Sequence, residues 1–257
     1  MSQDDIYSDI MGELNAHYKE NKVDVFVPSL GHTCQFTPIS VRQHKDILKT
    51  DDNLLQAGLQ FNININKIII DNSPTDNLLI IDRPAILLAL KASHLSDDLS
   101  LIISGEEHKA DIKAHVDSFT DIEFDPAISS SILTLDKFEI HCSIPTLAYD
   151  IIINEKIKSK IKGTSSESLV GSVGELFVYE MIKYINYVKS DTMTLNLKEL
   201  TFAQQISICE MIPLALSDKI IRYINSTRES EMPYITCKNI KGEYIRLPLS
   251  VTLFAGD

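Results

Sequence analysis

Residues 23–50, VDVFVPSLGHTCQFTPISVRQHKDILKT, constrain the fold more than any other part of the chain. The runs VDVFV and HTCQF alternate as β-strands do, and PSLG between them has the composition of a turn. Ser40 follows as a suitable N-cap, and Gln43 completes a capping box ahead of the apolar Ile47. The stretch therefore predicts a β-hairpin that leads directly into a helix.

The spacing of apolar residues in the segment 51–71 fits both the period of a strand and the period of a helix. FNININ alternates like a strand, whereas five residues recur at intervals of four and three, as on one face of a helix: Leu54, Gly58, Phe61, Ile65 and Ile68. Asparagine is unfavourable in strands and the longer window fits the helical period, so we predict a helix here.

Similar patterns divide the rest of the chain. We predict a helical lead-in over residues 1–22 and an apolar helix over 78–95 starting at Asp82. In the middle of the chain we predict strands at 99–103, 121–124 and 138–142, a short helix at 106–119 and a surface turn at 129–131. The remainder should hold a helix at 145–161, an interdomain loop at 163–168, an amphipathic helical stripe over 173–188, helices near 201–211 and 217–228, and a hairpin over 234–248 turning at Lys241-Gly242.

Together these elements predict an α+β fold. It has an N-terminal β-hairpin plus helices, a small antiparallel sheet in the middle, and a mostly helical C-terminal part that closes with a β-hairpin. We expect residues 1–22 to be a lead-in, 23–145 to hold the hairpin, helices and sheet, and 146–257 to form the helical part. The last two could also be one continuous domain.

The lead-in carries an apolar stripe, Ile6, Ile10, Met11 and Leu14, at helical spacing. We expect this stripe to pack on the body of the protein, as in an ordinary N-terminal helix. Docking on a partner is the alternative.

The net charge of −12 lies in the first part of the chain. Residues 1–150 hold 24 acidic residues against 11 basic ones, and residues 151–257 hold 12 against 13. This balance argues against binding to nucleic acid or to an anionic membrane. It suits a basic protein partner, although an acidic surface more often serves solubility alone. No apolar run reaches transmembrane length and no signal peptide is visible, so we expect a cytoplasmic protein.

The four cysteines include no C-x-x-C pair, which predicts free thiols without a disulfide, metal or cofactor. One other cluster suggests chemistry. Glu107, Asp111 and His115 fall four residues apart, so on a helix they would share a face, as in a metal-dependent hydrolase. The cluster lacks the H-E-x-x-H register, and a solvated polar face is the competing interpretation.

Four stretches in this order carry a resemblance to a known family: FVPSLGHTCQFTPISVRQHKDIL, LIIDRPAILLALKASHLSDDL, FEIHCSIPTLAYDI and YITCKNIKGEYIRLPLSVTLF. They resemble the T4-type bacteriophage baseplate protein family, which comprises baseplate hub subunits and hub-assembly factors of contractile-tailed phages. Relatives can carry C-x-x-C pairs of zinc-ribbon type. This chain has only Cys237 in the corresponding stretch, so we predict no zinc.

The resemblance implies a non-enzymatic baseplate hub component or hub-assembly chaperone that binds other phage tail proteins. It would act in the host cytoplasm during assembly or remain in the tail baseplate of the virion. We expect the hairpin and the apolar helix to form the partner-binding surface, through Phe26, Pro28, Phe36, Pro38, Ile86 and Leu90. The hydrolase with Glu107, Asp111 and His115 is the competing hypothesis.

Overall fold

The computed structural model describes residues 3–49, 54–93, 98–103, 106–121, 124–161, 173–231 and 234–248. Its elements in chain order are α1 Gln3–Glu20, β1 Val23–Val27, β2 His32–Phe36, α2 Val41–Ile47, α3 Leu54–Asn72, α4 Arg83–Ala92, β3 Asp98–Ile103, β4 Glu106–Asp111, α5 Ile112–Ser118, β5 Ser130–Leu135, β6 Phe138–Ser143, α6 Leu147–Ile161, α8 Val173–Tyr184, β7 Ile185–Lys189, β8 Thr194–Asn196, α9 Phe202–Met211, α10 Leu214–Glu231, β9 Tyr234–Asn239 and β10 Tyr244–Pro248.

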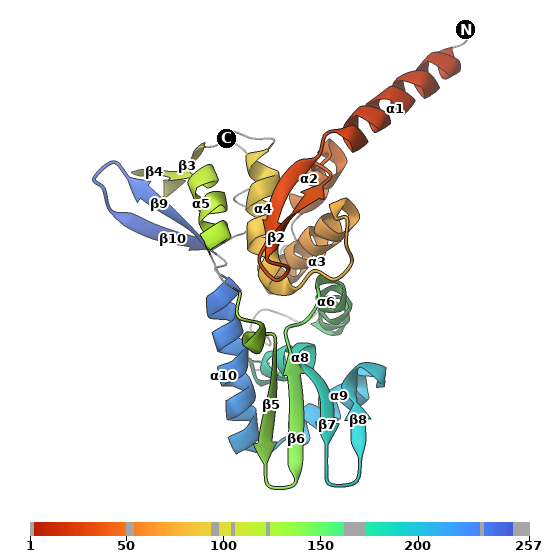
Figure 1. The fold of residues 1–257 in the computed structure, drawn as a ribbon, viewed down its shortest axis with the longest axis vertical. Coiled ribbons are helices and arrows are strands. Elements are labelled where there is room, and N and C mark those ends of the chain that lie inside the picture. The colour runs from red at the N-terminus through yellow and green to blue at the C-terminus, as the bar shows by residue number, and fades with distance from the viewer. Residues whose placement is uncertain are drawn as a thin grey trace.

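The fold is mixed α+β, with antiparallel sheets and hairpins at both predicted places (Figure 1). In Figure 1 the hairpin β1–β2 lies beside α4 in the upper part, and the lower part holds a sheet whose edge strand β5 lies beside α10. α1 projects from the upper part as an arm. One apolar core cluster includes residues of both parts.

The capping box and both hairpins form as predicted. Ser40 N–H donates to Gln43 Oε1 (2.9 Å), and Gln43 N–H donates to Ser40 Oγ (3.2 Å). Gly31 and Gly242 adopt φ values of 66° and 85°, which glycine reaches without the steric cost that a Cβ brings. The helical prediction for residues 51–71 is confirmed from residue 54 onward, since α3 continues from Leu54 to Asn72, and residues 51–53 lie outside the described residues.

Asp82 fastens the first hairpin to the start of α4. Its buried carboxylate accepts hydrogen bonds from Ser29 N–H (2.8 Å), Ser29 Oγ (2.7 Å) and Leu79 N–H (2.8 Å). Burial raises the pKa of Asp82, and these hydrogen bonds partly offset that rise. The turn predicted in PSLG and the helix predicted to begin at Asp82 are thereby one structural unit.

The two larger sheets combine strands that are distant in sequence. One has the order β10-β9-β4-β3, and the other has the order β5-β6-β7-β8. The strands of the predicted middle sheet therefore enter different sheets. Both sheets contain strands from before and after residue 145, where we expected a domain boundary.

The predicted helix over 106–119 is wrong in its first half. Residues 106–111 form β4, where buried His108 and Ala110 alternate with exposed neighbours, and α5 begins only after Asp111, which caps it. Pairing of β4 with β3 along its whole length outweighs the helical spacing of the charged residues.

Three further predictions need correction. The helical stripe over 173–188 ends at Tyr184, because residues 185–189 pair with β6 as strand β7. In the predicted surface turn at 129–131, residue 129 is a bend and residues 130 and 131 begin β5. In the predicted strand 121–124, residue 121 ends a 3₁₀ turn and residue 124 has no regular structure. Residues 122 and 123 and the predicted loop at 163–168 lie outside the described residues.

Candidate functional site

The six residues predicted to bind a partner belong to the core. Phe36, Ile86 and Leu90 have no exposed surface, Pro28 and Pro38 are buried, and Phe26 is half-buried. The side chains of α4 are buried from Pro84 to Lys91, so the helix lies inside the core on all of its faces. In this structure five of the six side chains are therefore not accessible to a partner, and Phe26 is accessible only in part, so their role in partner binding stays a prediction.

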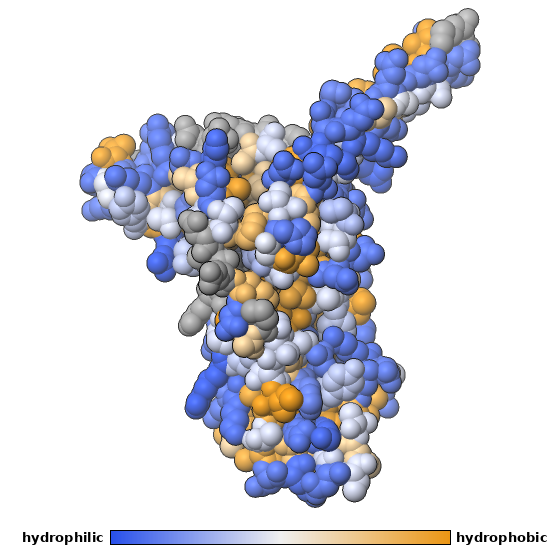
Figure 2. All heavy atoms as spheres, viewed as in Figure 1, coloured by the Kyte–Doolittle hydropathy of each residue, from blue (hydrophilic) through white to orange (hydrophobic). Residues whose placement is uncertain are grey.

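α1 presents an apolar surface that the body of the protein does not cover. None of its residues is buried, so the expectation of an ordinary packed helix is wrong. Five large apolar side chains are 38–67% exposed: Ile6, Tyr7, Ile10, Met11 and Leu14. The arm is mostly hydrophilic on the side visible in Figure 2, with apolar atoms toward its free end.

The last turn of α1 fixes the arm to the body. Tyr18 Oη lies within hydrogen-bond distance of the Pro38 carbonyl oxygen, Gln43 Oε1 (3.1 Å) and Asn72 Oδ1 (3.3 Å). Lys22 Nζ donates to Thr37 Oγ1 (2.7 Å) just beyond the helix. The arm is therefore held at its base, while its earlier turns make no buried contact.

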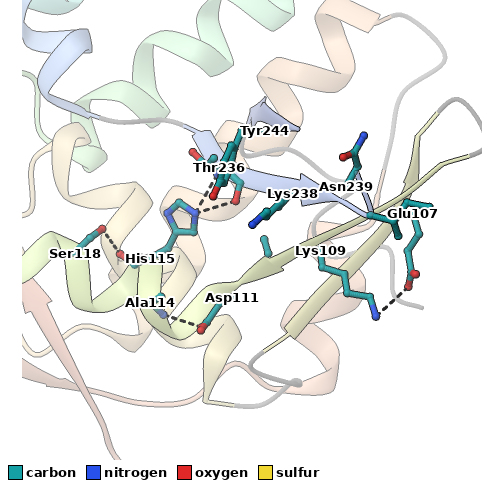
Figure 3. Close-up of a pocket in the computed structure, with 12 residues that line it drawn as sticks. Glu107, Lys109, Asp111, Ala114, His115, Ser118, Thr236, Lys238, Asn239 and Tyr244 are labelled. Atoms are coloured by element: carbon teal, nitrogen blue, oxygen red, sulfur yellow. Dashed lines mark hydrogen bonds and ion pairs between the residues drawn. The ribbon is translucent and has the colours of Figure 1, made fainter. Parts of the chain in front are cut away.

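A second feature is an open hollow of about 720 Å³ between α5 and the strands β4, β9 and β10 (Figure 3). Glu107, Asp111 and His115 all line it, although the first two are on a strand rather than on a shared helix. Lys109 and Lys238 also line it, so the hollow has charges of both signs.

The titratable side chains of this hollow are engaged in structural contacts. Asp111 Oδ1 accepts the Ala114 N–H (2.8 Å) as the cap of α5. Glu107 accepts a hydrogen bond from Ser100 Oγ (2.7 Å) and lies 3.5 Å from Lys109 Nζ. These contacts lower the pKa of Glu107, the hydrogen bond from Ser100 having the largest effect. No group of three or more His, Cys, Asp or Glu side chains in the described part of the chain is arranged to hold a metal ion.

His115 completes the sheet where two strands separate. β4 and β9 pair only at His108–Asn239 and Lys109–Lys238. Farther along β9, Thr236 N–H donates to His115 Nε2 (3.0 Å), and the carbonyl oxygen of the same residue lies 3.2 Å from this nitrogen. The imidazole thus takes the place of a neighbouring strand as the hydrogen-bond partner of the Thr236 backbone (Figure 3). His115 therefore has a structural role.

Replacing His115 with alanine is expected to destabilise the protein by about 1–2 kcal/mol, because Thr236 N–H loses its acceptor in a half-buried position. Urea denaturation followed by circular dichroism measures the effect. Lys113→Ala, at an exposed position on the same helix, is the control and should change stability by less than about 0.5 kcal/mol. Unchanged stability of His115→Ala together with loss of a bound metal or of hydrolytic turnover would instead favour the hydrolase hypothesis.

A third feature is an ionic network where α3, α4, α6 and α8 meet. The side chain of Asp150 is 5% exposed and that of Lys183 is 9% exposed, and Asp150 Oδ1 lies 2.8 Å from Lys183 Nζ. The other carboxylate oxygen accepts hydrogen bonds from Asn66 Nδ2 (2.8 Å) and Asn154 Nδ2 (2.9 Å) and lies 3.6 Å from Arg83 Nη1. One carboxylate thus holds side chains from all four helices.

The network continues toward α10 along the wall of a small pocket of about 260 Å³. Glu180 lies 3.4 Å from Lys183 Nζ and 2.7 Å from Arg228 Nη2. The pocket is thus bordered by ion pairs that are already formed within the protein.

The pKa shifts of the buried pair point to a structural role. Burial alone would raise the pKa of Asp150, but the charges of Lys183 and Arg83 outweigh it and hold that pKa below its ordinary value. Burial alone would lower the pKa of Lys183, but Asp150 and Glu180 raise it. Both groups are moved away from neutral pH, whereas a general acid or base is usually tuned toward it.

Sequence reasoning missed this network because no motif contains it. A signal is present in hindsight. Asp150 interrupts the apolar run LAYDIII, and Lys183 interrupts MIKYI. A single charge inside an apolar run indicates a buried ion when its partner also lies in such a run, since isolated charges are rarely buried.

Comparison with protein families, with curated proteins and with solved structures finds no match to this chain. Within the described residues, no helix combines the length and the apolarity needed to cross a lipid bilayer.

Proposed function

We propose that the chain is a non-enzymatic protein-interaction component, of the kind that the resemblance to T4-type baseplate proteins implies: a hub component or a hub-assembly chaperone. One observation carries the proposal. α1 extends from the body without a buried residue and presents a row of exposed apolar side chains. Free apolar stripes of this kind are unfavourable in water and are typical of helices that dock into a partner.

The charge distribution supports the same proposal. The acidic surplus lies in residues 1–150, which include the arm, and suits a basic protein partner. The protein would act in the host cytoplasm during tail assembly or as a part of the virion.

Affinity purification of the tagged chain from phage-infected cells tests the proposal, with bound proteins identified by mass spectrometry and mature particles probed in parallel. We expect tail hub proteins to co-purify. Absence of the chain from the particle would then indicate an assembly chaperone, and its presence there would indicate a hub subunit. Recovery of the chain without any tail protein would contradict the proposal.

A metal-dependent hydrolase remains the second candidate, since Glu107, Asp111 and His115 do line one hollow. The structural contacts of all three side chains count against it. The His115→Ala experiment described above separates the two candidates.

A further inference from the structure

The apolar side chains of α1 form one continuous stripe. With 3.6 residues per turn, successive side chains are about 100° apart, and the five exposed apolar residues fall within an arc of about 140°. They recur at steps of three and four residues along an 18-residue helix. This is the pattern by which a single helix inserts its apolar face into a groove.

Acidic residues surround this stripe. α1 holds five Asp and Glu residues against Lys19 alone, a balance of −4 with histidine neutral. On the helical wheel, Asp4 and Glu13 lie next to the stripe, one on each side, about 20° beyond its outermost apolar residues. Asp5 and Asp9 occupy the opposite face. A groove that encloses the stripe would therefore meet carboxylates at both of its rims.

This charge pattern favours some binding partners of the apolar stripe over others. A second copy would bring the same carboxylates against Asp4 and Glu13, and each copy has a net charge of −12, so like charges would face each other. An anionic lipid surface would be repelled for the same reason. A groove with lysine and arginine at its rims would be attracted and would also cover the apolar stripe.

We propose that α1 docks by its apolar stripe into an apolar groove, rimmed by lysine and arginine, on a different protein. This inference rests on the proposed function and adds the site and the chemistry of the partner. Tyr18 holds the base of the helix on the body, so the partner receives an arm of fixed direction.

The test uses the full-length chain, with the tail protein that co-purifies with it as the purified probe, in binding titrations at low and high salt. Ile10→Asp places a charge in the stripe and should weaken binding at least about 30-fold, as for an interface hot spot. Ser8→Asp, which adds the same charge outside the stripe, is the matched control and should bind no more weakly than the parent chain. Circular dichroism melting should be unchanged in both variants, because neither residue is buried.

The rim charges are tested with the double variant Asp4→Lys and Glu13→Lys. We expect about three- to tenfold weaker binding at low salt and a smaller difference at high salt, since salt screens exposed charges. Tighter or unchanged binding of this variant would overturn the basic groove. Full binding by Ile10→Asp would show that the partner uses another surface, which overturns this inference but leaves the proposed function intact. A concentration-dependent dimer in sedimentation that Ile10→Asp abolishes would identify a second copy as the occupant and also overturn it.

Discussion

Replacing Asp150 with alanine is expected to destabilise the protein by about 3–5 kcal/mol, because Lys183 would remain buried without its closest counter-charge. Urea denaturation followed by circular dichroism measures the loss. Glu155→Ala is the matched control. Glu155 is on the same helix and pairs with Lys67 at 2.6 Å, but both side chains are 51% exposed, so its loss should cost less than about 1 kcal/mol. Equal effects of the two substitutions would contradict the buried network.

The same pair sets a pH window for stability. The pKa of Asp150 is lower in the folded state, so its contribution is present above the unfolded value of 3.8 and is lost as the pH falls through the folded pKa. The pKa of Lys183 is raised, so its contribution is present below 10.5 and is lost as the pH rises through the folded pKa. The destabilisation caused by Asp150→Ala should therefore shrink in strong acid, where Asp150 of the parent protein becomes protonated. It should also shrink in alkali, because burial lowers the pKa of Lys183 once Asp150 is absent.

Replacing Phe36 with aspartate is expected to abolish folding, with a cost above about 4 kcal/mol, whereas Tyr7→Asp should leave stability within about 0.5 kcal/mol. Phe36 has no exposed surface, so the substitution removes a core ring and buries a charge, while Tyr7 is 67% exposed on the arm. Thermal melting followed by circular dichroism distinguishes the two results. A soluble, cooperatively melting Phe36→Asp protein would restore the hairpin as a possible binding surface.

Local signals in the sequence were sufficient for many elements. The capping box at Ser40, the turn at Gly242 and the choice of helix for 54–72 depend on residues close together in sequence, and all three are confirmed. Prediction from local patterns failed where pairing between strands determines the secondary structure. Residues 106–111 have helical charge spacing and residues 185–188 continue a helical stripe, but both are strands, because β3 and β6 provide partners that local patterns do not reveal.

In the candidate site, too, local sequence predicts some features, and others depend on contacts between distant elements. The apolar stripe of α1 is visible in the sequence, yet nothing local distinguishes a stripe that packs on the body from one that remains exposed. Conversely, Phe36 and Leu90 are large apolar residues of the kind found in binding surfaces, but their side chains are buried in the core. Burial depends on which elements meet, and the meeting of distant helices also creates the network around Asp150.

The sheet β10-β9-β4-β3 has a consequence for biosynthesis. β4 ends at Asp111, and its partner β9 begins at Tyr234, 123 residues later. At about 5–20 residues per second, a ribosome needs roughly 6–25 s to make that interval. During this time one edge of β4 has no strand to pair with, and an open edge can recruit strands from other chains. The charged side chains of β4, EEHKAD, oppose such recruitment, so this edge is protected until β9 has been made.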